Sequence, residues 1–189
     1  MKRALNTIKN EHRSMAVILN AMHHMVQRIR DGSGHPDFDA LRAILYYLDA
    51  FTERLHHPKE DEFLFQPLRA RTGEADALID DMGQEHARGA AAIRSLEQAL
   101  LRYETGGERE FVAFATAAEG FSDFYSQHMH KEETLVMPLA EKLFADEDWR
   151  RIDAAFSANR DPLAGVDEDQ EFRNLFSRIV SLVPPPLLG

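Results

Sequence analysis

The chain has 189 residues, a length that suits one domain with a full hydrophobic core. Apolar residues make up 44% of the sequence and charged residues 29%, a composition that is typical of globular proteins and excludes a disordered chain. The net charge of −10 argues against nucleic acid and against an anionic membrane surface as partners, and the absence of cysteine excludes disulfides and thiolate ligands. No apolar run approaches the ~18 residues of a membrane span and no signal peptide is visible, so we expect a cytoplasmic protein.

Four long helical patterns follow one another along the chain, separated by short breaks that contain glycine or proline. They cover about residues 2–30, 37–68, 74–103 and 108–144. Asp37 directly follows Pro36 and is expected to cap the second helix. No segment alternates between apolar and polar residues with a period of two, so no sheet is expected. Four long helices with short connections predict an all-α protein with an up-down-up-down four-helix bundle.

Apolar residues at helical spacing define the core face of these patterns and two further, shorter helices. The core positions are Leu41, Ile44, Leu45, Leu48 and Leu55 in the second pattern and Phe114, Phe121, Phe124 and Leu135 in the fourth. The two short C-terminal helices are predicted around Trp149, Ile152 and Phe156 and over residues 172–180. We therefore expect a bundle over residues 1–145 and a helical extension over 146–189 packed on the same domain. This extension is expected to cover one side of the bundle or to mediate association, for instance as a homodimer.

The two halves of the bundle share one pattern of histidine and glutamate. The first half has Glu11-His12, then His56 and Glu60, and the second has Glu85-His86, then His128 and Glu132. In both halves the second histidine is followed by a glutamate four residues on, then by a short apolar run and a proline. The sequence therefore looks like a duplicated helical hairpin.

The spacing of these residues places them together in the bundle interior. A histidine and a glutamate at i and i+4 lie one turn apart on one face of a helix, about 6 Å along its axis. A buried glutamate among apolar residues is costly unless it is paired or bound to a metal. Counting from the predicted helix ends puts the four histidines at one level. The candidate metal ligands are His12, His56, Glu60, His86, His128 and Glu132.

Six ligands of this kind suit two metal ions. Each ion would take two imidazoles and one oxygen from each of two bridging carboxylates, Glu60 and Glu132, with an oxo or hydroxo bridge as a further ligand. Imidazole plus carboxylate suits iron, with manganese and zinc as alternatives, so we expect two Fe ions. The alternative is a bundle in which the same residues are polar core positions and bind no metal.

With these motifs, the sequence resembles the hemerythrin-like, HHE cation-binding family. The resemblance covers about residues 1–145 and rests on Glu11-His12, His56-His57-Pro58-Lys59-Glu60, Glu85-His86 and His128-Met129-His130-Lys131-Glu132-Glu133. It implies a di-metal site. Oxygen-carrying hemerythrins have a further histidine one turn after the third-helix histidine, where this chain has Ala90. At least one metal is therefore expected to be more open than in those proteins.

The resemblance also implies a range of functions. The first hypothesis is a non-haem di-iron protein that binds or senses O2 or NO, or that handles iron, and that is a binding protein rather than a turnover enzyme. The second is a di-iron oxidoreductase or an iron-centre repair factor that acts on peroxide or nitric oxide. The third is a structural bundle with zinc or with no metal.

Several polar residues lie outside the candidate ligand set. His23 shares a helix face with His12 but lies ~16 Å farther along the axis, which favours a core or rim residue over a third site. Four more histidines are predicted to lie at the surface, namely His24, His35, His57 and His130. Tyr125 precedes His128 by one turn and is predicted either to donate a hydrogen bond to the site or to be a packed aromatic residue.

Overall fold

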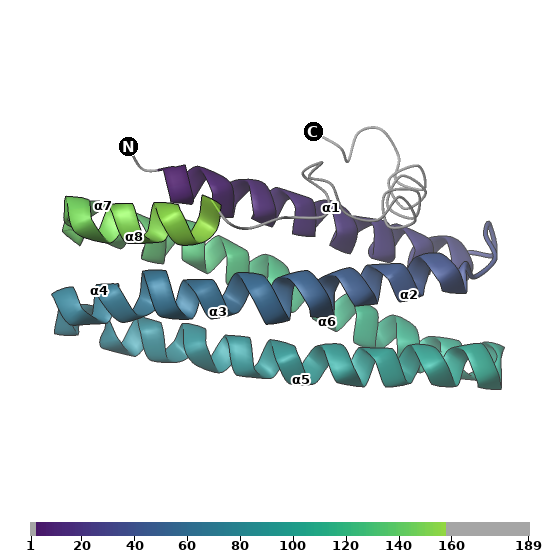
Figure 1. Ribbon diagram of the computed structural model, residues 1–189. Coiled ribbons are helices and arrows are strands. Elements are labelled where there is room, and N and C mark those ends of the chain that lie inside the picture. The colour runs from purple at the N-terminus through teal and green to yellow at the C-terminus, as the bar shows by residue number, and fades with distance from the viewer. Residues whose placement is uncertain (1–2, 158–189) are drawn as a thin grey trace.

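Figure 1 shows a computed structural model of the protein, which describes residues 3–157. Within this range every regular element is a helix, which confirms the predicted all-α class. Four long helical rods run antiparallel to their neighbours and form an up-down-up-down bundle (Figure 1). In the same range no helix is long and apolar enough to cross a membrane. The helix predicted over 172–180 lies outside the described residues.

The first two rods form the first hairpin of the bundle. The first rod is the single helix α1 (Arg3–Arg30). The second rod contains α2 (Phe38–Tyr47), α3 (His57–Glu60) and α4 (Gln66–Arg71), joined by π-helical segments at Leu48–His56 and Asp61–Phe65. Asp37 caps this rod as predicted, because its side chain accepts a hydrogen bond from the backbone N–H of Ala40 at 3.1 Å.

The third and fourth rods form the second hairpin. The third rod opens with a 3-10 turn at Gly73–Ala75 and continues as α5 (Asp76–Gly106). The fourth rod consists of a 3-10 turn at Glu108–Glu110, α6 (Phe111–Lys131), a π-helical segment at Glu132–Val136 and α7 (Met137–Leu143). The chain reverses between these rods at Gly107, whose φ of 74° lies in the left-handed region that glycine adopts without steric cost.

A layer of buried polar side chains divides the apolar core into two clusters. The first cluster lies between α1, α2, α5 and α6 and includes Met22, Ile44, Leu48, Phe114 and Phe121. The second lies at the other end of the bundle and includes Ile8, Leu64, Phe65, Met82 and Val136. On each rod the buried histidines and glutamates fall between these two clusters. The polar layer is thus enclosed by apolar packing on both sides.

The short helix α8 (Asp146–Ser157) closes one side of the second cluster. Its apolar residues Trp149, Ile152 and Phe156 are buried there, and α8 lies along the N-terminal half of α1 (Figure 1). The Lys59 ammonium donates a hydrogen bond to the carbonyl oxygen of Ala155 at 3.1 Å, which ties α8 to the second rod. The described part of the predicted extension therefore packs on the bundle.

One predicted core residue of the fourth rod is exposed. Leu135 is 52% exposed, whereas its neighbour Val136 is fully buried. The prediction assumed α-helical spacing, but Glu132–Val136 is π-helical. A π turn contains more residues than an α turn, so the buried position falls one residue later in the sequence than α-helical spacing predicts.

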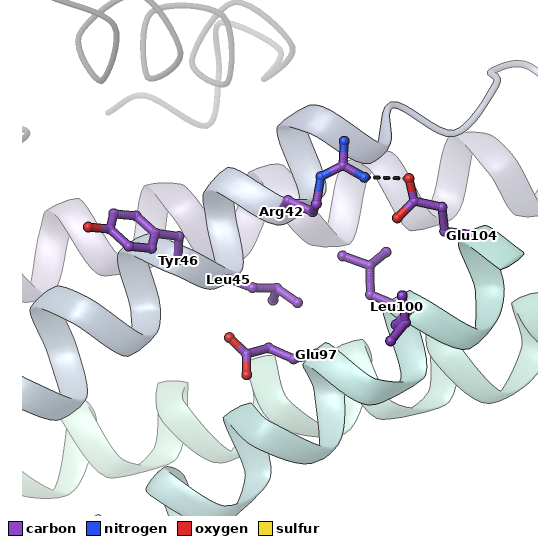
Figure 2. Close-up of a pocket in the computed structure, with 7 residues that line it drawn as sticks. Arg42, Leu45, Tyr46, Glu97, Leu100 and Glu104 are labelled. Atoms are coloured by element: carbon purple, nitrogen blue, oxygen red, sulfur yellow. Dashed lines mark hydrogen bonds and ion pairs between the residues drawn. The ribbon is translucent and has the colours of Figure 1, made fainter.

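A surface groove lies between α2 and α5, away from the polar layer. Figure 2 shows Leu45 and Leu100 between the two helices, with an ion pair between Arg42 and Glu104 at one end. Tyr46 and Leu101 border the groove and are exposed. The groove contains no histidine.

Candidate metal centre

A π-helical segment turns two adjacent histidines into the bundle. His56 ends this segment, and the N–H of His57 donates to the carbonyl of Thr52, five residues back. Both side chains are buried, with His57 only 3% exposed, so the prediction of a surface position for His57 is wrong. The prediction rotated His57 by the 100° of an α-helical step. Residues in a π turn are separated by a smaller angle, so two successive side chains can face the same interior.

The six predicted ligands converge at one level of the bundle, and His57 joins them. The short approaches link His12 Nε2 with Glu132 Oε2 at 3.2 Å, His56 Nε2 with Glu60 Oε1 at 3.1 Å, and His86 Nε2 with His128 Nε2 at 3.2 Å. The layer thus gathers side chains from all four rods, as the counting from helix ends predicted.

The ligand atoms fall into two groups, each with all its atoms within 4.8 Å of one another. The first position consists of His12, His56, Glu60 and Glu132. The second position consists of His57, Glu60, His86 and His128. Glu60 belongs to both groups, and Glu132 also faces the second one, at 4.0 Å from His86 Nε2 and 3.8 Å from His128 Nε2. The two carboxylates therefore lie between two candidate cation positions.

Each of the five histidines has a carboxylate behind its ring. The Nδ1 to oxygen distances are 2.9 Å for His12 and Glu133, 2.7 Å for His56 and Glu11, 3.5 Å for His57 and Glu53, 2.9 Å for His86 and Asp61, and 3.0 Å for His128 and Glu85. In the four closer pairs the carboxylate accepts a hydrogen bond, which fixes the orientation and tautomer of the ring and leaves Nε2 as the free ligand atom, whereas His57 Nδ1 makes no hydrogen bond of good geometry. The arrangement is the one that metal-binding histidines usually have.

The supporting acids follow from the sequence repeat, although sequence reasoning did not assign them. Glu11 precedes His12 and Glu85 precedes His86, while Asp61 follows Glu60 and Glu133 follows Glu132. In each of these pairs one residue faces the centre and its neighbour supports a histidine of another rod. An acidic residue next to four of the six candidate ligands was the available signal.

The buried atoms of the layer fit metal ions. His12 Nε2, His56 Nε2 and all four carboxylate oxygens of Glu60 and Glu132 make no hydrogen bond of good geometry within the described part of the chain. Buried carboxylates without such partners are costly, and native proteins rarely leave them so. A cation shared between these lone pairs would satisfy them. Imidazole nitrogen and carboxylate oxygen together suit iron, zinc and manganese.

Without a metal, the charges of the layer balance through protonated histidines. Burial lowers the pKa of His56, but the Glu60 carboxylate and the hydrogen bond that His56 donates to Glu11 outweigh it and raise this pKa to about 9. Burial lowers the pKa of His12 too, but the nearby carboxylates of Glu132 and Glu133 outweigh it and hold this pKa well above its usual value. Burial and the neighbouring His86 hold the pKa of His57 well below its usual value, so His57 stays neutral.

Metal uptake at neutral pH should therefore release about two to three protons per chain, because His12, His56 and His86, whose pKa values are all raised, must be neutral to bind. The raised pKa of His56 stabilises the metal-free fold fully below its ordinary value of 6.5, and this contribution is lost as the pH rises through about 9. We expect the rise in melting temperature on adding metal to grow between these two pH values. Calorimetry in buffers of different ionisation enthalpy measures the protons, and uptake without proton release at pH 7 would contradict the assignment.

The fold and this histidine and carboxylate layer define a helical bundle built to bind metal cations. The family model of the hemerythrin HHE cation binding domain matches residues 3–140, and the chain belongs to that family. The resemblance found in the sequence is thus confirmed. Comparison with curated proteins and with solved structures gives no significant match.

The remaining polar residues are distributed around this centre. His35 and His130 are exposed as predicted, and His24 is half-buried. His23 is exposed, so it has no place in the core. Tyr125 is buried, with its ring stacked on that of His57 at a centroid distance of 5.8 Å.

Proposed function

We propose that this chain is a non-haem di-iron protein that binds or senses a small diatomic ligand, O2 or NO, or that handles iron. The observation that supports this most strongly is the convergence of imidazole nitrogens and carboxylate oxygens at one buried level of the bundle. Membership of a cation-binding family supports it independently. Iron suits the mixed nitrogen and oxygen ligands, and manganese and zinc are the alternatives.

In this proposal the side chains of the layer form two sets, and each set binds one ion. His12 and His56 would hold one ion, and His57, His86 and His128 would hold the other, with Glu60 and Glu132 lying between the two positions. When bound, iron supplies a redox-active ion that can receive a small ligand. The chain supplies the rest: the acids behind the histidines fix the rings, and the apolar clusters on both sides keep water from the layer.

Loading with ferrous iron under anaerobic conditions is expected to give about two iron ions per folded chain, because the layer offers two groups of ligands. Elemental analysis of the desalted protein measures this number. Calcium, which prefers oxygen ligands, serves as the control and should neither bind in the layer nor displace iron. One iron or none per chain at saturation would contradict the di-iron proposal, whereas turnover of peroxide by the loaded protein would favour an oxidoreductase.

A further inference from the structure

The repeat between the two halves is broken beside one of the ligands. Because His56 corresponds to His128, the residue after it, His57, corresponds to Met129. Met129 is buried in the first apolar cluster, whereas His57 is buried in the polar layer. The break therefore adds one imidazole to one half of the centre and none to the other.

The position of His57 is set by the aromatic rings around it, since its Nδ1 makes no hydrogen bond of good geometry. Its ring is stacked on that of His86, with centroids 4.0 Å apart and an angle of 11° between the planes. On the Nδ1 side, Glu53 Oε2 lies at 3.5 Å. Tyr125, whose ring is also stacked on His57, reaches a space that exists only because residue 89 is glycine: a Cβ there would lie 2.4 Å from the Tyr125 hydroxyl.

The added imidazole makes the two positions chemically different. Both positions border the carboxylates of Glu60 and Glu132, but the first adds two imidazoles to them and the second adds three. Imidazole ligands favour iron, zinc and other later divalent metals, whereas carboxylate oxygen favours manganese and magnesium. Three imidazoles also bind such a metal more tightly than two do.

We propose that the second position, with His57, His86 and His128, loads first and selects a nitrogen-preferring divalent metal such as Zn²⁺ or Fe²⁺. The first position loads later and, because oxygen makes up a larger share of its ligands, also accepts Mn²⁺. The chain can then hold an ordered pair of two different metals. This inference rests on one part of the proposed function, the binding of two ions in the layer, and not on iron or on a diatomic ligand.

The test uses the metal-free full chain and zinc, which undergoes no redox change. Calorimetric titration with Zn²⁺ is expected to show two separate binding events whose affinities differ by more than about tenfold, the effect that even an outer partner of a metal ligand exerts. A chain given one equivalent of Zn²⁺ and then excess Mn²⁺ should retain about one zinc and one manganese by elemental analysis. Electron paramagnetic resonance should show a single class of bound Mn²⁺.

Variants assign the tighter event to His57. H57M copies the Met129 of the other half. It should weaken the tighter Zn²⁺ binding, which belongs to the second position, by more than about tenfold and leave the weaker binding at the first position unchanged. E53Q keeps the ligand but weakens its support, so it should give a smaller loss in the same event. H130A alters an exposed histidine of the fourth rod and should change neither event.

Several results would overturn the inference. They are two Zn²⁺ events of equal affinity, displacement of zinc by manganese from both positions, and unchanged affinities in H57M. The titration of the unaltered chain is decisive even where H57M fails to fold. Saturation at one metal or none would instead remove the two-metal proposal itself, so the two failures are distinguishable.

Discussion

Replacing Glu60 by Gln is expected to abolish metal loading at both positions of the centre, from about two ions per chain to fewer than one. Glu60 is fully buried and belongs to both groups of ligand atoms. Gln keeps the size of the side chain but removes the negative charge that two cations share, and it turns one ligand oxygen into a donor. Elemental analysis of the variant after anaerobic iron loading measures the loss.

The matched control is Glu62→Gln on the same rod, where the side chain is exposed and loading should stay complete. Glu132→Gln should resemble Glu60→Gln, because its carboxylate also lies between the two positions. In the metal-free Glu60→Gln chain the pKa of His56 should also be lower than in the unaltered chain, since the Glu60 carboxylate helps to raise it. A variant that still binds two tightly held irons would show that Glu60 does not bridge.

The helices of the described chain were predictable because their signals are local. Apolar spacing and the breaks at glycine and proline gave four rods whose ends differ from the observed ends by only a few residues. The π-helical segments were not predicted, since a single extra residue in a turn leaves the average spacing of apolar residues almost unchanged. Leu135 shows the consequence: it was predicted to be buried, but after the π turn its neighbour Val136 takes the buried position.

The candidate centre was predictable where a repeat carried the information. The duplicated spacing gave six residues that the structure brings together, from helices far apart in the sequence. His57 was missed because its orientation depends on the π turn before it. The supporting acids were missed for a different reason: Glu11 contacts His56 and Glu85 contacts His128, and contacts between helices are not visible in local spacing.

His57 also changes the expectation drawn from Ala90. The alanine indicated that the centre has one imidazole fewer than oxygen-carrying relatives and hence a more open metal. In the structure His57 brings the number of histidines in the layer to five. We therefore expect the second position to be the more completely filled, and the first position, with two histidines, to be the one that takes an external ligand.

The ferrous protein is therefore expected to bind nitric oxide at the first position when oxygen is absent, with about one NO per chain. That position lies beside aromatic side chains: the ring of His56 is 6.2 Å from that of Phe51 and 6.3 Å from that of Phe156. Apolar walls exclude water and anions but admit an uncharged diatomic molecule. Titration of the loaded protein with NO, followed by absorption and by electron paramagnetic resonance, measures the stoichiometry.

Phe156→Ala should expose this position to solvent, because Phe156 is buried on α8 with its ring edge against His56. We expect the ferrous variant to be oxidised in air faster than the unaltered chain, while it still loads two irons and still binds NO. Loss of a buried phenyl ring also costs about 3–5 kcal/mol of stability. Absorption spectra recorded after exposure to air give the oxidation rate, and thermal unfolding gives the stability.

Ile152→Ala separates the two effects of that substitution. Ile152 lies one turn earlier on α8 and is fully buried in the same apolar cluster, so its truncation should cost a comparable 2–5 kcal/mol or so. If α8 only stabilises the bundle, both variants will oxidise at the same rate once the temperature is adjusted to equal stability. If Phe156 shields the first position, Phe156→Ala alone will oxidise faster. Equal rates in the two variants would place the entry of oxygen elsewhere and leave α8 a purely structural helix.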